Sequence, residues 1–173
     1  MTAYIVECQE KKTTHLSSLI FPTITKLELG STYNYKDIVR GKNGKPQPIF
    51  TKYFNISHCD HYWCIVFSNE ECGIDIENST REINQRLSRR ILAKNEESID
   101  DNPLKTWVLK EAYAKYRGEG IGLPFNGFTT DKIRQNYYVN DLSTNDYICF
   151  TIQQNQAPIQ TIFARWENNT VLL

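Results

Sequence analysis

The alternation of apolar and polar residues along the chain predicts a series of short β-strands. Residues 3–7 (AYIVE) favour an opening strand because this short run includes the β-branched Ile5 and Val6, whereas residues 16–29 show no clean period. Residues 54–68 (FNISHCDHYWCIVFS) predict a strand, a turn and a second strand, since two aromatic and β-branched runs flank an Asp-His pair. Further antiparallel strands are expected at residues 137–139, 146–152 and 160–166.

The segment CGIDIE, residues 72–77, alternates with the period of two that is typical of a strand. This period places Asp75 and Glu77 on one face and Ile74 and Ile76 on the other. Two carboxylates side by side on a strand repel one another, so they need solvent, a base or a cation nearby. Most acidic strand faces are simply solvated. Other parts of the sequence have to show whether this face is solvated or lies against a base or a cation.

Two stretches have the period of an amphipathic helix. Residues 83–95 (INQRLSRRILAKN) carry apolar positions near one stripe. The stronger pattern begins with Asn102 as a cap, continues with Pro103 at the first helical position and ends at Gly118. The core face of this second helix is expected to contain Leu104, Trp107, Val108 and Ala112.

Within the second helix, Glu111 and Lys115 lie one turn apart and therefore share a face. The commoner explanation of this spacing is a surface ion pair, which stabilises a helix by roughly 0.2–0.5 kcal/mol. The alternative is half of an active site. Residues 36–52 (KDIVRGKNGKPQPIFTK) suggest an exposed basic loop, which is either solvated or a cradle for an anion.

Composition indicates a folded globular chain. Its 173 residues include 20 basic and 20 acidic side chains and 40% hydrophobic residues, enough for a substantial core. Because the charges cancel, no overall positive field favours nucleic acid or an anionic membrane surface, and any phosphate binding has to be local. We expect one domain, or two small halves packed closely together.

The cysteines and the N-terminus favour a soluble cytoplasmic protein. The five cysteines form no Cys-x-x-Cys pair and no spacing suited to zinc, so we expect reduced and mostly buried thiols. Residues 1–15 carry charges where a signal peptide needs an apolar run, and the longest apolar stretch covers only residues 62–67.

Three acidic groups suggest a cation site, namely Asp75 and Glu77 on the strand and Glu111 on the helix. If strand and helix pack together, their oxygen donors suit a hard cation such as Mg²⁺ better than zinc or copper. Magnesium is commonly held by a few carboxylates together with phosphate oxygens of a substrate. Lys115, one turn beyond Glu111, would then face the same phosphates as a point charge.

Four motifs follow one another in the chain: GKP at 44–46, FNISH at 54–58, GIDIE at 73–77 and WVLKEAYAK at 107–115. This series resembles the 4'-phosphopantetheinyl transferases. It is most similar to the larger single-chain class related to the surfactin synthetase-activating enzyme, because about 70 residues precede the GIDIE strand. The resemblance covers residues 44–128, about half of the chain.

The resemblance implies an α+β fold of two pseudo-symmetric halves with the active site in the cleft between them. Residues 1–68 would form a shortened N-terminal half with the coenzyme A-binding loop, and residues 69–173 the half that carries the metal and catalytic motifs. The larger class usually places further adenine- and 3'-phosphate-binding basic residues in its first half, so the shorter half here implies that nucleotide recognition is reduced or built differently. Cys59 also stands where the family often has a serine.

An activity follows from the same resemblance. Members of the family move the phosphopantetheine arm of metal-bound coenzyme A onto a serine of an acyl or peptidyl carrier protein and release adenosine 3',5'-bisphosphate. The implied metal is Mg²⁺, the co-substrate coenzyme A and the partner an apo carrier protein, and we expect a monomer. The alternatives are a non-catalytic relative that binds coenzyme A or a carrier protein, and another Mg²⁺-dependent phosphoryl enzyme.

The resemblance also gives roles to the acidic groups and to one lysine. Asp75, Glu77 and Glu111 look like magnesium ligands on the pyrophosphate. Glu111 is also the candidate base that accepts the serine proton, directly or through water. Lys115 resembles the lysine that contacts the pyrophosphate and supports its developing charge.

The remaining roles concern coenzyme A. Ser57 and His58 resemble the pair that holds its phosphates, and Lys45 resembles the loop lysine near its adenosine end. Basic side chains of the loop are also candidates for contacting the 3'-phosphate of coenzyme A, although such loop residues are more often solvated. These candidates are Arg40, Lys42 and Lys52.

Overall fold

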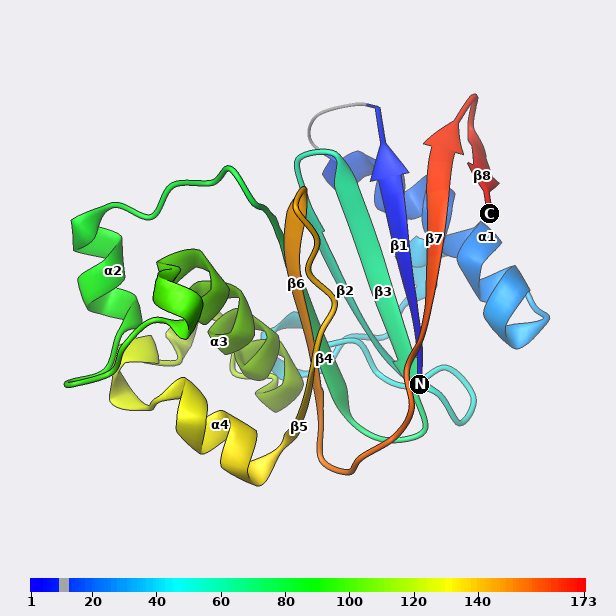
Figure 1. The fold of residues 1–173 in the computed structure, drawn as a ribbon. Helices are drawn as coiled ribbons and strands as arrows, with labels where there is room; N and C mark the ends of the chain where they lie inside the picture. The colour runs from blue at the N-terminus through cyan, green and yellow to red at the C-terminus, as the bar shows by residue number, and fades with distance from the viewer. Residues whose placement is uncertain (10–12) are drawn as a thin grey trace.

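Two β-sheets form the centre of the molecule in the computed structural model, which describes residues 1–9 and 13–173 (Figure 1). In this part of the chain, the first sheet has five strands in the order β2-β3-β1-β7-β8, and the second has three in the order β4-β6-β5. The first comprises β1 (Thr2–Cys8), β2 (Tyr53–Cys59), β3 (Tyr62–Ser68), β7 (Gln160–Glu167) and β8 (Thr170–Leu172). The second comprises β4 (Cys72–Asn78), β5 (Tyr138–Asp141) and β6 (Tyr147–Gln153).

Helices cover the outer faces of the two sheets (Figure 1). Those of the described residues are α1 (Ser17–Leu29), α2 (Gln85–Ile91), α3 (Pro103–Arg117) and α4 (Thr130–Asn136). Helix α1 packs on the first sheet, where Phe21 meets Trp63 in one core cluster, and α3 packs on the second, where Val108 meets Phe150 in another. The strands and helices together confirm the predicted α+β class.

A third core cluster fills the space between the sheets. Ala3 and Ile5 from β1 meet Ile74 and Ile76 from β4 there. Because alternate residues of a strand point to opposite faces, Asp75 and Glu77 project from the other face of β4, as the period of two predicted. The cysteines are mostly buried, also as predicted, with Cys59 the half-buried one.

The chain repeats one strand arrangement in its two halves. In the first sheet β3 lies between β1 and β2 and is antiparallel to both, and in the second β6 lies between β4 and β5 and is antiparallel to both. In each of these three-stranded arrangements, a helix that packs on the sheet lies between the first strand and the later strands in the chain. This helix is α1 after β1 and α3 after β4. The division at residues 68 and 69 stays a prediction, and β7 and β8 return to the first sheet, where β7 is parallel to β1.

Strands β1 to β7 and helix α3 appear where the sequence predicted them, whereas β8, α1 and α4 were missed. Helix α1 falls in residues 16–29, where Pro22 lies inside the helix and the buried positions include the polar Ser17 and Thr25. Polar residues on the buried face blur the apolar stripe on which the prediction depends. Helix α4 (TDKIRQN) contains a single apolar residue, Ile133, so it has no apolar stripe from which a helix could be predicted.

Helix α2 is shorter than the predicted range of 83–95. The Asn84 side chain accepts a hydrogen bond from the backbone N–H of Leu87 and so starts the helix, and Leu92 has an extended conformation that ends it. In α3 the cap is the predicted one, because Asn102 accepts a hydrogen bond from the N–H of Leu104 at 3.0 Å.

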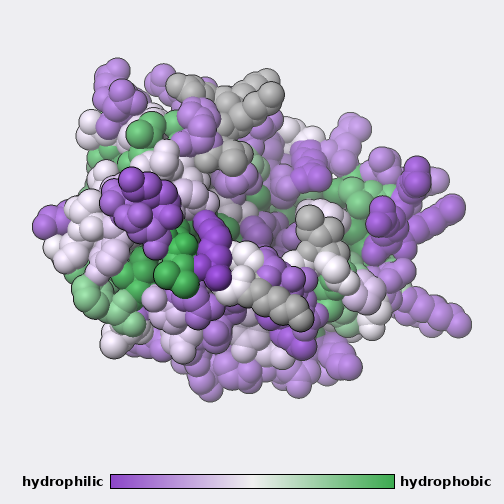
Figure 2. All heavy atoms as spheres, turned by 180° about the vertical axis from the view of Figure 1, so that it is seen from behind, coloured by the Kyte–Doolittle hydropathy of each residue, from purple (hydrophilic) through white to green (hydrophobic). Residues whose placement is uncertain are grey.

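The surface seen from behind is mainly hydrophilic, and apolar side chains gather in several separate areas on it (Figure 2). Within the described residues, the longest helix is too short and too polar to cross a membrane.

Candidate active site

Ser57, Asp75 and Lys115 meet where the edge strands β2 and β4 approach α3. The Lys115 ammonium donates hydrogen bonds to Ser57 Oγ at 2.6 Å and to Asp75 Oδ1 at 2.7 Å, and the Ser57 hydroxyl donates to the same Asp75 oxygen at 2.7 Å. Ser57 and Asp75 are buried. The three residues come from three different motifs, which the tertiary structure therefore joins at one point.

Glycine at position 73 allows α3 to lie close to β4. A Cβ atom at Gly73 would lie 2.2 Å from the carbonyl oxygen of Ala112 and 2.7 Å from the backbone nitrogen of Tyr116. Any larger residue would therefore push the helix away from the strand. This close approach brings the Lys115 ammonium within hydrogen-bonding distance of the Asp75 carboxylate.

Glu111 lies one turn before Lys115 on α3, and both residues line a cleft beside this cluster. The pKa of Glu111 is raised to about 7, mainly by burial and also by the charges of Asp75 and Glu77, whereas Lys115 and Arg81 oppose the shift. Burial also raises the pKa of Glu77, and Arg81 opposes this shift. Glu111 and Lys115 do not form the surface ion pair that their spacing alone suggests, because Lys115 turns to Asp75.

A cleft of about 270 Å³ extends from this cluster toward the basic loop. Its lining includes the charged and titratable residues Arg40, Lys45, His58, Glu111 and Lys115. The pKa of the His58 imidazole is lowered by desolvation and by the positive charge of Lys115. The cleft is thus open to an anion and bordered by basic side chains from both halves of the chain.

The loop lysine Lys45 is tied to the C-terminal end of α3. Its ammonium donates to the carboxylate of Glu71 and to the carbonyl of Tyr116, and it lies 5.5 Å from the centre of the Tyr116 ring. Gly118, in a left-handed conformation at the end of α3, also accepts a hydrogen bond from the Asn43 amide at 3.0 Å. The loop is therefore held against α3 at the edge of the cleft.

The other basic loop residues that were candidates for binding the 3'-phosphate lie in different places. Arg40 lines the cleft, donates to the Gly44 carbonyl at 3.0 Å and lies over the Tyr35 ring at 5.4 Å. Lys52 is engaged elsewhere, since its ammonium donates to the Asn69 side chain at 2.8 Å. The side chain of Lys42 lies outside what the structure describes.

The carboxylates around Glu111 are of the ligand type that a hard cation prefers. Asp75, Glu77 and Glu111 offer only oxygen ligands. Burial and, to a smaller extent, repulsion from the other two carboxylates raise the pKa of Glu111, and a cation would relieve that repulsion. In the described residues, no three metal-ligating side chains are gathered into a ready metal site. Asp75 and Glu77 instead pair with Lys115 and with Arg81.

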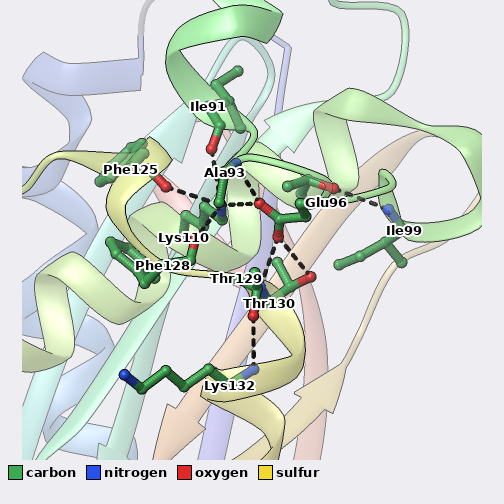
Figure 3. Close-up of polar contacts among 11 residues, drawn as sticks. Ile91, Ala93, Glu96, Ile99, Lys110, Phe125, Phe128, Thr129, Thr130 and Lys132 are labelled. Atoms are coloured by element: carbon green, nitrogen blue, oxygen red, sulfur yellow. Dashed lines mark hydrogen bonds and ion pairs between the residues drawn. The ribbon is translucent and has the colours of Figure 1, made fainter.

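Lys110, which precedes Glu111 and is fully buried, is a structural residue that the sequence analysis missed (Figure 3). Its ammonium donates to the Glu96 carboxylate at 2.5 Å and to backbone carbonyls of Ile91, Phe125 and Phe128. Glu96 also accepts hydrogen bonds from the backbone N–H groups of Ala93 and Thr130. This buried pair fixes the segments on either side of α3.

A sequence signal for Lys110 existed in the helical period. Residues 106, 110 and 114 lie at intervals of four, on a face whose other members, Thr106 and Ala114, are buried. A lysine in that row has to find acceptors inside the protein, because an unpaired buried charge is costly.

Comparison with known proteins identifies a family for this chain. Residues 71–166 match the family model of the 4'-phosphopantetheinyl transferase superfamily. The chain is 34% identical over 102 residues to the 4'-phosphopantetheinyl transferase gsp of Aneurinibacillus migulanus, which covers 54% of this chain and 43% of that protein. It is 31% identical over 86 residues to the 4'-phosphopantetheinyl transferase Sfp of Bacillus subtilis (strain 168), or 44% of this chain and 38% of Sfp. The alignments thus span less than half the length of these relatives.

Proposed function

Because the chain belongs to the 4'-phosphopantetheinyl transferase superfamily, we propose that it transfers 4'-phosphopantetheine from coenzyme A to a serine of a carrier protein. The observation that carries the proposal is the contact of Lys115 with Asp75 and Ser57 beside Glu111. The partner is an apo acyl or peptidyl carrier protein. We also propose that the protein acts as a cytoplasmic monomer, and light scattering after size-exclusion chromatography tests the oligomeric state.

The basic lining of the cleft suits the phosphates of coenzyme A. The pyrophosphate would lie near Lys115, Ser57 and His58, where the Lys115 ammonium supplies positive charge. Lys45 and Arg40, farther along the cleft, would face the adenosine end and its phosphate. Binding both ends of the donor fixes the position of the reacting phosphorus, and positioning is a large part of catalysis in phosphoryl transfer.

The reaction forms a bond between the serine oxygen and the phosphorus on the pantetheine side of the pyrophosphate. The bond from that phosphorus to the bridging oxygen breaks, and adenosine 3',5'-bisphosphate leaves with this oxygen. Glu111 accepts the serine proton, and its partly buried position beside two other carboxylates increases its proton affinity. The Lys115 ammonium stabilises the charge that develops on the leaving pyrophosphate oxygens.

Asp75, Glu77 and Glu111 would hold Mg²⁺, which supplies positive charge against the pyrophosphate. In the protein by itself, Asp75 has a second role, because it anchors the Lys115 ammonium and the Ser57 hydroxyl. The position of Lys115 therefore depends on the same strand that supplies the metal ligands.

Intact mass spectrometry tests the proposal. The chain is incubated with coenzyme A, Mg²⁺ and a panel of apo acyl and peptidyl carrier proteins, and each carrier is examined for the mass of a phosphopantetheine adduct. An adduct that requires Mg²⁺ and appears together with adenosine 3',5'-bisphosphate is the expected result. Binding of coenzyme A with no adduct on any carrier would instead support the non-catalytic relative. A different nucleotide product would indicate another phosphoryl enzyme.

A further inference from the structure

Arg81 holds one of the carboxylates that the proposed function needs for metal binding. Its guanidinium donates to Glu77 Oε1 and lies 5.6 Å from the centre of the Trp107 ring. Trp107 in turn meets the Phe125 ring edge-on at 5.5 Å. Arg81 is thus placed between a carboxylate and an aromatic face, both of which favour a cation.

The turn after β4 fixes the backbone of Arg81. Its N–H donates to the Asn78 carbonyl at 3.0 Å, and the Asn78 side chain accepts from the N–H of Thr80 at 3.0 Å. The N–H of Ser79 donates to the carbonyl of Asp146 at 3.1 Å, which ties the turn to the segment before β6. The hydrogen-bonded turn therefore holds Arg81 beside Glu77.

The contact of Arg81 with Glu77 changes the charge balance of the proposed metal site. When ionised, Asp75, Glu77 and Glu111 carry three negative charges, and two cations, Lys115 and Arg81, act on them. The Glu77 side chain is 17% exposed, so its charge is only partly screened by water. Arg81 therefore supplies, in the protein alone, part of the positive charge that a divalent cation would supply.

We propose that Arg81 competes with the metal for Glu77, so that the protein binds the cation weakly until coenzyme A is present. This inference rests on the proposed function. The pyrophosphate provides additional oxygen ligands, which help the cation to displace the guanidinium from the Glu77 carboxylate. Metal and coenzyme A then bind cooperatively, and Arg81 increases that cooperativity by weakening only the binding of metal alone.

Direct measurement of Mn²⁺ binding, by the loss of the free-ion signal in electron paramagnetic resonance, tests the inference. We expect Arg81→Gln to bind Mn²⁺ about two- to fivefold more tightly than the unmodified protein when coenzyme A is absent, because a partly exposed ion pair is lost. The factor by which coenzyme A increases Mn²⁺ affinity should fall correspondingly. Equal or weaker Mn²⁺ binding by Arg81→Gln would overturn the inference.

Two further variants separate this inference from the proposed function. Arg165→Gln removes an exposed arginine that pairs with Glu7 on the first sheet, so Mn²⁺ affinity should not change. In Glu77→Gln, the added effect of Arg81→Gln should disappear, because the competition has lost its target. If Arg81→Gln still tightens binding there, the competition is not for Glu77 and the inference fails. If the unmodified protein and Glu77→Gln bind no Mn²⁺ even with coenzyme A, the metal site fails and the inference falls with it.

Discussion

Gly73 on β4 and Ala112 on α3 approach so closely that a Cβ atom on the glycine would lie 2.2 Å from the Ala112 carbonyl oxygen. No real Cβ atom tolerates such a contact, so strand and helix can lie at this separation only with glycine at position 73. The separation matters chemically, because Asp75 lies two residues along the strand and Lys115 three residues along the helix. Their ion pair at 2.7 Å depends on it.

Gly73→Ala should therefore both destabilise the protein and impair transfer. We expect a loss of about 1–3 kcal/mol in the free energy of unfolding, typical of overpacking, measured by urea denaturation. Activity should fall even where the variant is fully folded, because α3 moves away from Asp75. Gly122→Ala is the control, since a Cβ there meets nothing within 4 Å. Full activity in folded Gly73→Ala would contradict the role of this contact.

Asp75→Ala should abolish metal-dependent transfer while the fold survives. The variant loses a proposed metal ligand and leaves the Lys115 ammonium without its carboxylate partner. We expect at least a hundredfold decrease in kcat/KM, with circular dichroism still showing a folded protein. Asp37→Ala, at an exposed carboxylate on the surface, provides the matched control. Wild-type rates in Asp75→Ala would refute the assignment of this residue.

Lys45→Ala should weaken coenzyme A binding more than it slows the chemical step. Lys45 lines the cleft away from Glu111 and holds the loop against Glu71 and the end of α3. We expect an increase in KM for coenzyme A of about tenfold with kcat nearly unchanged, the pattern for loss of uniform binding. Lys52→Ala removes a basic residue of the same loop that donates to Asn69 instead, and should leave KM unchanged. An unchanged KM in Lys45→Ala would remove this residue from the binding site.

The buried pair of Glu96 and Lys110 should make stability depend on acid pH. Although burial opposes it, hydrogen bonds from Lys110, Ala93 and Thr130 lower the pKa of Glu96 below its usual value. A carboxyl whose pKa is lower in the folded state contributes stability above its unfolded pKa of about 4.3. That contribution is lost as the pH falls through the folded value. Urea unfolding measured from pH 7 to pH 3 should show this loss.

Glu96→Gln tests the same pair. It should cost about 3–5 kcal/mol at pH 7, because Lys110 remains charged in the interior, and it should flatten the acid decline in stability. Asp100→Asn, which breaks an exposed pair with Lys105, should change neither quantity appreciably. An equally steep acid decline in Glu96→Gln would show that other groups are responsible.

The sequence by itself determined the local features of this protein. Alternation in GIDIE placed Asp75 and Glu77 on one face, and the Asn102 cap, Pro103 and Gly118 defined α3, because these signals depend on neighbouring residues. Motif order also pointed to the family. Helix α1 remained hidden, since its buried face includes polar residues and takes its stability from packing on the sheet.

Only the tertiary structure decided which charges meet. By helical spacing Lys115 belongs to Glu111, yet the packing of α3 on β4 pairs it with Asp75 and Ser57. Likewise, the fold places Arg81 against the Trp107 ring and buries Lys110 among acceptors from distant segments. Charge pairing depends on distance and burial, and both are set by how the elements pack, so the letters alone could not give it.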